Sequence, residues 1–298
     1  MNHGDSRPQL STRAVEVAIE SADGTSLHGS LWRAESPRAG LLLVHGMQSH
    51  AGWFEVSGTS DDLAADRFTV LAYDRRGSGR SDGPRGDSPS SEAFLEDFAA
   101  ARSYLAAELA DCGSAGAPLH VLANCFGTRI VLPYLAKHPG TFTSVILTAP
   151  ATHMSRAADF RLATKLHILT APGSETFATP LEDRLFVSSG PFLDWIRDDR
   201  HALREVTARF LRETQMLTRR MHQAARELEL PMLVILGSRD AMVINDKIKD
   251  EFVARYRGPI EVLELDAEHY VDFTDQQPAL AAAVSRWASS HCVLEDAV

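Results

Sequence analysis

The chain has 298 residues, of which 44% are hydrophobic and 23% charged, a composition typical of a globular protein with a sizeable core. Its net charge of −10 argues against a nucleic-acid partner, and no Lys- and Arg-rich block predicts contact with an anionic membrane. The three cysteines, Cys112, Cys125 and Cys292, are odd in number and widely spaced, which excludes a disulfide framework or a zinc pattern.

The sequence also carries no signal for a cofactor, a metal or a membrane. No cluster of His, Cys, Asp and Glu has the spacing of a metal site, so we expect neither metal nor cofactor. The N-terminal stretch MNHGDSRPQL lacks the apolar segment of a signal peptide. No apolar run approaches the ~20 residues that a membrane span needs. These features predict a cytoplasmic protein without a membrane span, and they leave the oligomeric state open.

Eight short segments have the hydrophobicity of β-strands. The first two alternate in hydrophobicity around Asp23-Gly24, which is the signal of an antiparallel hairpin. The third is a continuous apolar run, as expected for a strand that is buried on both faces. The predicted strands are Val15–Ile19, Ser26–Trp32, Ala39–Val44, Phe68–Tyr73, Leu119–Leu122, Ser144–Thr148, Met232–Leu236 and Ile260–Leu265.

Helical patterns separate most of these strands, and the alternation predicts a mostly parallel sheet with helices on both faces. Residues 151–228 interrupt the alternation with helical stretches only. We therefore expect a helical cap inserted between two core segments, 13–150 and 229–292. The predicted core helices are Asp61–Asp66, Ser91–Leu109, a helix through Ile130 to Leu135, Lys247–Tyr256 and Ala279–Ala288.

The sharpest predicted turn lies between the strand at Leu119 and the helix that follows it. Only Asn124-Cys125-Phe126-Gly127 join the two, and the small residues Ala123 and Gly127 flank Cys125 at two positions on either side. Such a turn exposes its apex side chain at a helix N-terminus, where a thiol tends to become a thiolate. Cys125 is thus predicted to be a covalent nucleophile. The alternative is a cysteine that packs as a small hydrophobe.

The carboxyl ends of parallel strands meet at one edge of a sheet, where ligand sites lie. Three side chains at such ends, Cys125, Asp240 and His269, supply a nucleophile, an acid and a base. We predict that His269 takes the thiol proton and that Asp240 orients its ring. Asp266 and Glu268 compete for the acid role, but both lie too near His269 in sequence to reach the far ring nitrogen well.

Acyl transfer also requires hydrogen-bond donors for the oxyanion. The backbone N–H groups of Met47 and Phe126 are predicted to supply them, because they follow a strand end and the nucleophile respectively. His45-Gly46 then shapes the first of these loops and His45 need not act as a base. No substrate-binding residue is assigned. The cap arginines Arg156, Arg161 and Arg197 could hold an acidic group or a carrier phosphate, or could be solvated.

With these motifs in place, the chain resembles the α/β-hydrolase superfamily, and within it the monoglyceride lipase and lysophospholipase branch. That branch is recognised by its HG loop and by a YDxRGxGxSxG turn, which Tyr73 to Gly83 match here. The stretch DDRHALREVTARFL also resembles the branch's cap, and the likeness spans roughly residues 15–290. The resemblance implies an α/β-hydrolase fold with a mostly parallel eight-stranded sheet, flanking helices and a helical cap insertion.

The elbow departs from the family pattern G-x-S-x-G, because it reads Ala123-Asn124-Cys125-Phe126-Gly127. A tetrahedral intermediate expels a thiolate more readily than an alkoxide, which disfavours unactivated esters and favours thioesters, enol esters and lactones. Dienelactone hydrolases, a related family, also carry cysteine at this apex. The prediction is a hydrolase that cleaves an ester or thioester of a small-molecule or carrier-bound acyl substrate through acyl-Cys125. An acyltransferase or cyclase, and a non-catalytic ligand-binding module, remain alternatives.

Overall fold

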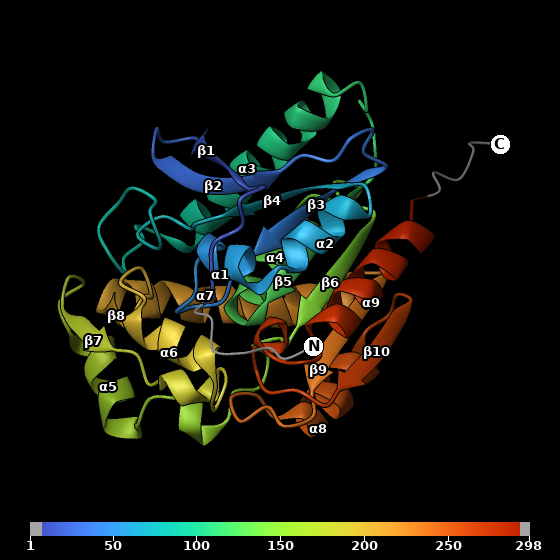
Figure 1. The fold of residues 1–298 in the computed structure, drawn as a ribbon. Coiled ribbons are helices and arrows are strands. Elements are labelled where there is room, and N and C mark those ends of the chain that lie inside the picture. The colour runs from blue at the N-terminus through green and yellow to red at the C-terminus, as the bar shows by residue number, and fades with distance from the viewer. Residues whose placement is uncertain (1–7, 293–298) are drawn as a thin grey trace.

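A computed structural model describes residues 8–292, so the part of the N-terminal expectation that rests on residues 1–7 lies outside the described residues. An eight-stranded sheet runs through the molecule in the order β1-β2-β4-β3-β5-β6-β9-β10 (Figure 1). β2 pairs antiparallel with β1 and with β4, and the remaining neighbours are parallel. The strands are β1 (Val15–Glu20), β2 (Ser26–Trp32), β3 (Ala39–Val44), β4 (Phe68–Tyr73), β5 (Leu119–Asn124), β6 (Ser144–Thr148), β9 (Met232–Gly237) and β10 (Ile260–Leu265). The predicted α/β-hydrolase sheet is confirmed.

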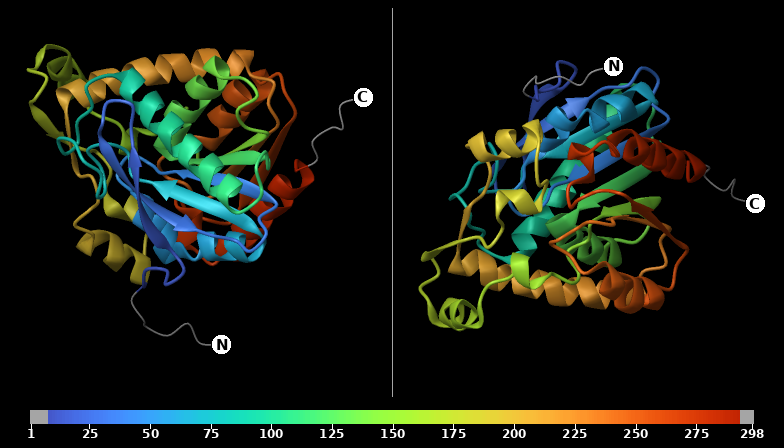
Figure 2. Two further views of the ribbon diagram at one scale, coloured as in Figure 1. Left: turned by 90° about the horizontal axis from the view of Figure 1, so that it is seen from above. Right: turned by 60° about the horizontal axis from the view of Figure 1, so that its bottom comes forward.

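Helices cover both faces of this sheet, as Figure 2 shows. One apolar core lies under α3 (Ser91–Asp111) and α4 (Thr128–Lys137), and the other lies under α2 (Thr59–Ala65) and α9 (Gln277–Ser290). Alternate residues of each central strand enter opposite cores; in β3, for example, Leu42 packs in one and Leu41 in the other. Burial on both faces is therefore the reason for the continuous apolar runs in the sequence.

The segment between β6 and β9 contains two short strands as well as helices. β7 (Thr176–Ala178) pairs antiparallel with β8 (Glu205–Thr207), so the prediction of helices alone in residues 151–228 is wrong. A three-residue strand is too short to show a period of two in its hydrophobicity. The helices of this segment are α5 (Leu162–Thr170), α6 (Pro191–Asp198) and α7 (Ala208–Glu227). Of these, α7 packs along α4, whereas α5 and α6 lie beside the sheet with β7 and β8 (Figure 1).

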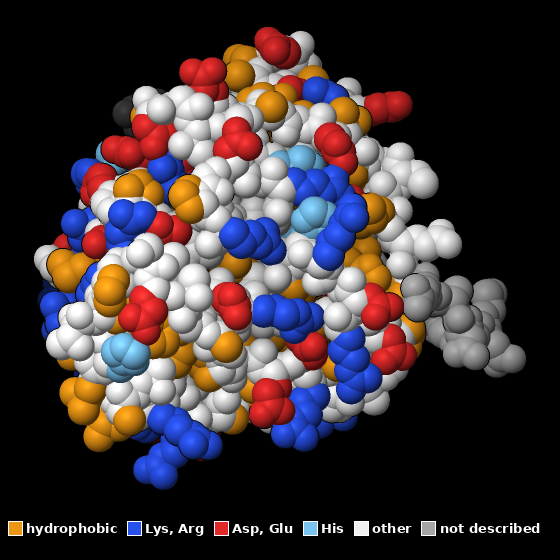
Figure 3. Space-filling view, turned by 90° about the vertical axis from the view of Figure 1, so that its left-hand side faces the viewer, with side chains coloured by type: hydrophobic (Ala, Val, Ile, Leu, Met, Phe, Trp, Pro, Cys, Tyr) orange, Lys and Arg blue, Asp and Glu red, His pale blue; other side chains and the backbone are white. Residues whose placement is uncertain are grey.

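α5 turns an apolar face to solvent. Leu162, Leu166 and Leu169 are 72%, 58% and 67% exposed, and their spacing of four and three residues places them on one side of the helix. The space-filling view of the side that carries β7, α5 and α6 shows hydrophobic side chains among interspersed acidic and basic ones (Figure 3).

Two further helical predictions need correction. α1 (Ala51–Ser57) is absent from the prediction, because seven residues give little helical periodicity. The predicted helix Lys247–Tyr256 is irregular, with an α-helical turn at Asn245–Lys247, a π-helical turn at Ile248–Phe252 and a 3₁₀ turn at Val253–Arg255. Hydrophobic spacing does not distinguish these turns from one another.

Candidate active site

Cys125 occupies a strained turn between β5 and α4. Its φ is +45°, a left-handed conformation that a residue with a β-carbon rarely adopts, and its side chain is 6% exposed. The turn brings the backbone of Gly127 against β3, where an added β-carbon would lie 2.6 Å from the carbonyl oxygen of Val44. Ala123, in place of the family's first glycine, is fully buried in β5, opposite Val44. The chain thus forms a sharp nucleophile-type elbow with Cys125 at its apex.

The structure brings Asp240 and His269 together behind this elbow. Nδ1 of His269 donates to Oδ2 of Asp240 at 2.7 Å, and neither side chain is exposed. The other carboxylate oxygen, Oδ1, accepts from the backbone N–H groups of Met242 and Val243 at 2.7 and 3.1 Å. Asp240 is therefore held by three hydrogen bonds, and it fixes the ring of His269 in one orientation.

The two rival acids make other contacts. Asp266 forms an ion pair with Arg239 at 3.3 Å, and Glu268 accepts a hydrogen bond from the backbone N–H of Ser188 at 2.9 Å. Neither carboxylate contacts the ring of His269 in the described part of the chain. The geometry therefore supports Asp240 as the acid that faces this histidine.

The pKa of the His269 ring is strongly shifted. Burial alone would lower its pKa, but the negative charges of Asp240 and Cys125 outweigh burial and raise the pKa to about 10. Its second nitrogen, Nε2, is buried and has no hydrogen-bond partner with good geometry among residues 8–292. The raised pKa keeps the ring of His269 protonated at neutral pH, so Nε2–H can donate to a group beside it.

The loop after β3 is held by Arg75, a side chain that sequence patterns did not single out. Arg75 is fully buried, and its Nη2 donates to the carbonyl oxygens of Gly46 and Met47, both at 2.9 Å. Its guanidinium carbon also lies 4.8 Å from the centre of the Phe126 ring. One cation thus contacts both segments that were predicted to supply oxyanion donors.

This contact sets the direction of the Gly46–Met47 peptide. In a trans peptide the C=O and the following N–H point in opposite directions, so a carbonyl of Gly46 aimed at Arg75 turns the Met47 N–H the other way. Met47, Phe126 and Cys125 all line one cavity. The arrangement is consistent with Met47 N–H and Phe126 N–H as oxyanion donors.

His45 contributes to the same loop through its backbone and ring. Its Nδ1 donates to the carbonyl oxygen of Gly46 at 2.8 Å, and its Nε2 accepts from the backbone N–H of Arg75 at 3.1 Å. Complete burial, reinforced by the charge of Arg75, holds the pKa of His45 well below its ordinary value. Both ring nitrogens are occupied, so His45 acts in loop geometry rather than as a base.

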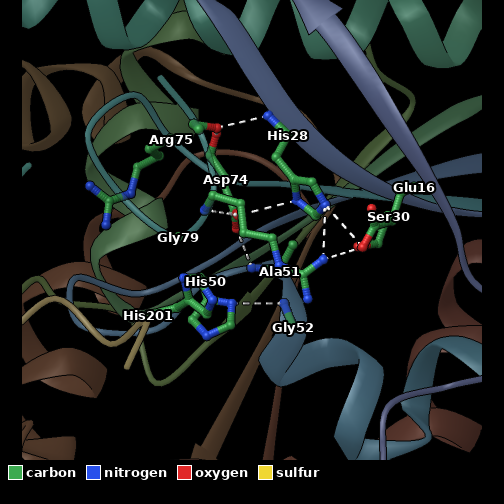
Figure 4. A network of polar contacts seen from close by, with 12 residues as sticks. Glu16, His28, Ser30, His50, Ala51, Gly52, Asp74, Arg75, Gly79 and His201 are labelled. Carbon is green, nitrogen blue, oxygen red and sulfur yellow. Dashed lines mark hydrogen bonds and ion pairs between the residues drawn. The ribbon is translucent and has the colours of Figure 1, made fainter. Parts of the chain in front are cut away.

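A polar network around Asp74 anchors the turn that carries Arg75 (Figure 4). Asp74 Oδ1 accepts from the N–H of Ala51 at 2.6 Å, and Oδ2 accepts from the N–H of Arg80 at 2.8 Å. Nδ1 of His28 lies 3.2 Å from the same Oδ2. Although burial opposes it, this contact, with others, lowers the pKa of Asp74 far below its usual range. The carboxylate therefore links the start of α1, the glycine-rich turn and β2.

The cavity beside Cys125 has a volume of about 90 Å³. About 10–15 Å³ of such a volume is needed to hold one water, so the cavity has room for a short acyl group in this conformation. Phe160, Leu181 and Leu211 give it apolar walls from the segment between β6 and β9. Arg129, Asp159, Thr214 and Gln215 add polar side chains to the same lining.

The cap arginines suggested by the sequence do not face this cavity. Arg156, Arg161 and Arg197 are exposed, and Arg197 pairs with Asp194 at 3.1 Å. Arg129 lines the cavity instead. It lies in the first turn of α4, four residues after Cys125, and this nearness to the elbow in sequence is the signal from which it could have been identified.

The described residues show neither a membrane span nor a metal centre. Between residues 8 and 292 no helix combines the length and the apolarity needed to cross a membrane. In the same part of the chain, no three His, Cys, Asp or Glu side chains gather as ligands of a metal ion would.

Fold and site together define an enzyme of the α/β-hydrolase type. The chain belongs to the family described as serine aminopeptidase, S33 (Hydrolase_4), whose model matches residues 35–269. Although that family is named for a serine enzyme, Cys125 stands at the elbow of this chain.

Similar proteins place the chain near the monoacylglycerol lipases. It is 28% identical to a monoacylglycerol lipase of Mycolicibacterium smegmatis over 291 residues, which cover 95% of this chain and 99% of the relative. The fold matches a monoacylglycerol lipase of Paleococcus ferrophilus with a TM-score of 0.77 and 18% identity, covering 89% of this chain and 99% of that chain. A soluble variant of monoglyceride lipase from Saccharomyces cerevisiae matches with a TM-score of 0.78 and 15% identity, covering 99% of both chains. The predicted resemblance to this branch is confirmed.

Proposed function

We propose that this protein is a hydrolase that cleaves an ester or thioester through an acyl-Cys125 intermediate. The observation that carries the proposal is the strained Cys125 at the elbow beside the buried His269–Asp240 pair. Cys125 acts as the nucleophile, His269 as acid and base, and Asp240 as the group that orients and stabilises the imidazolium. The substrate is a small-molecule or carrier-bound acyl compound.

The proposed reaction has two steps. The Cys125 thiolate attacks the substrate carbonyl carbon, and the oxyanion that forms is stabilised by the N–H groups of Met47 and Phe126. His269 Nε2–H gives its proton to the leaving oxygen or sulfur as the bond to the acyl carbon breaks. Water then attacks the acyl-cysteine, His269 accepts its proton, and the carboxylic acid leaves as the thiolate is expelled. Both steps use the same three side chains.

The cysteine at the apex determines which leaving group a good substrate must carry. The monoacylglycerol lipase names of the relatives suggest an ester substrate. A thiolate, however, is a better leaving group than an unactivated alkoxide, so the intermediate from a plain ester tends to return to substrate. A thioester, an enol ester or a strained lactone has a leaving group that competes with Cys125. The cavity of about 90 Å³ also favours a short acyl group over a long fatty chain.

A second candidate function differs only in the acceptor of the acyl group. The apolar part of the cavity wall, formed by Phe160, Leu181 and Leu211, offers a surface for an organic acceptor in place of water, which favours transfer from Cys125 to another nucleophile. An acyltransferase or cyclase would use the same acyl-enzyme. A non-catalytic binding module is the weaker alternative, because nucleophile, histidine and acid are all present in one arrangement.

Intact-protein mass spectrometry after incubation with an acetyl thioester tests this proposal. We expect one acetyl group on the wild type, located on the peptide of Cys125, and none on Cys125→Ala. Cys112 and Cys292, free thiols of the same chain, serve as internal controls for non-specific acylation. Loss of the adduct in water identifies a hydrolase, and faster loss with an added amine identifies a transferase. Equal labelling of the three cysteines, or no labelling, would contradict the acyl-Cys125 mechanism.

Arg75 gives a separate prediction about the oxyanion loop. Arg75→Met removes the hydrogen bonds to the carbonyl oxygens of Gly46 and Met47 but keeps the apolar stem. Because a misplaced oxyanion donor costs about 3 kcal/mol of barrier, we expect kcat to fall roughly 100-fold with little change in KM. Steady-state kinetics on an activated thioester measures both constants. Arg75→Lys, which keeps a cation, should recover part of kcat, whereas a change confined to KM would contradict the positioning role.

A further inference from the structure

The guanidinium of Arg129 has terminal nitrogens that no group among residues 8–292 engages. Arg129 lines the same cavity as Cys125. Its Nε donates to the carbonyl oxygen of Ala151 at 3.3 Å, and its guanidinium carbon lies 5.8 Å from the centre of the Phe126 ring. Among residues 8–292, no hydrogen bond or ion pair engages its Nη1 or Nη2. Four N–H donors thus remain for a ligand.

Asp159, an acidic side chain of the cavity wall, forms no ion pair with Arg129 in the described part of the chain. Asp159 also lines the cavity, but its carboxylate accepts from the N–H of Phe160 at 2.9 Å and from the ammonium of Lys165. Asp159 and Lys165 therefore balance each other. Arg129 adds one further positive charge, and burial lowers its pKa, opposed by the charges of Cys125 and Asp159. Arg129 is partly buried, and among the described residues only its Nε has a hydrogen-bond partner, so an anion at its terminal nitrogens would be stabilised.

We propose that Arg129 binds a carboxylate carried by the acyl group of the substrate, which makes that substrate an ester or thioester of a short dicarboxylic acid. The inference rests on the proposed acyl-Cys125 chemistry and narrows its substrate class. A guanidinium binds a carboxylate through two parallel N–H···O bonds, a geometry that no neutral acyl group can match.

The cavity shared by Arg129 and Cys125 limits the length of that acid. Cys125 lies in a 3₁₀ turn, and Arg129 lies in the first turn of α4 that follows it. A chain that joins a carbonyl carbon at Cys125 to a carboxylate at Arg129 must fit in this one cavity, which favours a short acid. The cavity of about 90 Å³ has room for such a chain, and its apolar walls contact methylene groups.

Arg129 could instead act on the nucleophile, since its charge also stabilises a thiolate at Cys125. The two roles have different consequences. Stabilisation of the thiolate would affect every acyl group equally, whereas binding of a carboxylate would affect acidic acyl groups alone. Comparison of charged and neutral reagents of the same shape therefore separates them.

Alkylation of Cys125 tests the carboxylate site without any acyl transfer. Iodoacetate and iodoacetamide both form a C–S bond with the thiolate and release iodide, but only iodoacetate carries a carboxylate. We expect the iodoacetate-to-iodoacetamide rate ratio to be at least about tenfold higher at Cys125 than at Cys112, the exposed reference thiol of the same chain. Arg129→Met should lower this ratio to that of Cys112. Peptide mass spectrometry gives both rates.

Arg197→Met is the matched control, because it removes an exposed arginine that pairs with Asp194. This variant should keep the wild-type preference for iodoacetate. Equal ratios at Cys125 and Cys112 in the wild type, or a preference that survives in Arg129→Met, would overturn the proposal. Failure of both reagents to alkylate Cys125 would overturn it as well, because the site must admit a short carboxylate.

Acylation by two thioesters extends the test to substrates. The wild type should be acylated roughly 100-fold faster by a succinyl thioester than by a butyryl thioester of the same thiol, and Arg129→Met should lose this preference because its succinyl rate falls far more than its butyryl rate. An equal loss with both thioesters would assign Arg129 to the thiolate and overturn the proposal. If iodoacetate is preferred but neither thioester acylates Cys125, the carboxylate site stands and the acyl-Cys125 mechanism fails.

Discussion

Cys125→Ala should lower kcat/KM on an activated thioester by at least about 10⁴-fold, because it removes the atom that forms the covalent intermediate. The buried pair of Asp240 and His269 and the oxyanion loop would persist, so the residual rate over water reports their contribution alone. Stopped-flow or steady-state release of the thiol measures the loss. Thermal unfolding should change little, since the side chain is small and the strained turn also accommodates alanine.

Cys125→Ser is the informative companion to this variant. A serine at the apex matches the family pattern and makes the enzyme oxygen the poorer leaving group. We therefore expect Cys125→Ser to gain activity on simple esters relative to thioesters, measured as the ratio of the two kcat/KM values. Full activity of Cys125→Ala on both substrates would contradict the assignment of the nucleophile. A serine variant with an unchanged ratio would contradict the leaving-group argument.

The parts of the fold with strong local signals were predictable from the sequence. Continuous apolar runs such as Ala39–Val44 identify strands buried on both faces, and the elbow is visible because its small flanking residues are a steric requirement at Gly127. The proximity of Asp240 and His269 also followed from the sequence, because parallel strands bring their carboxyl ends to one edge.

The remaining features depend on tertiary contacts that leave no periodic signal. β7 and β8 have three residues each, and their pairing is not visible in local hydrophobicity. Arg75 looks like one more charged residue of a glycine-rich turn, and only the structure shows that it is buried against two carbonyls of another loop. The sequence alone also does not distinguish an exposed arginine from one in the site. In the structure Arg197 is exposed and pairs with Asp194, whereas Arg129 lines the cavity.

His269→Ala should lower kcat/KM by about 10⁴-fold or more, because members of a catalytic triad act as a unit. The variant should also lower the reactivity of Cys125 at neutral pH. In the wild type, the pKa of His269 is raised to about 10, so its imidazolium persists at neutral pH and is lost only as the pH rises towards 10. A cation beside a thiol promotes its reaction, so iodoacetamide should alkylate Cys125 faster in the wild type than in His269→Ala at pH 7.

Peptide mass spectrometry at pH 7 gives the alkylation rate of Cys125 in both proteins. The protonated ring of His269 also contributes to folding stability: because the pKa of His269 is raised on folding, its contribution is fully present below about pH 6.5 and disappears as the pH rises through about 10. Asp240→Asn is a companion variant that removes the charge but keeps a side chain of the same shape. Its activity should also fall about 10⁴-fold. A loss of only a few-fold in His269→Ala, with an unchanged alkylation rate of Cys125, would place the base and the stabilising charge elsewhere in the site.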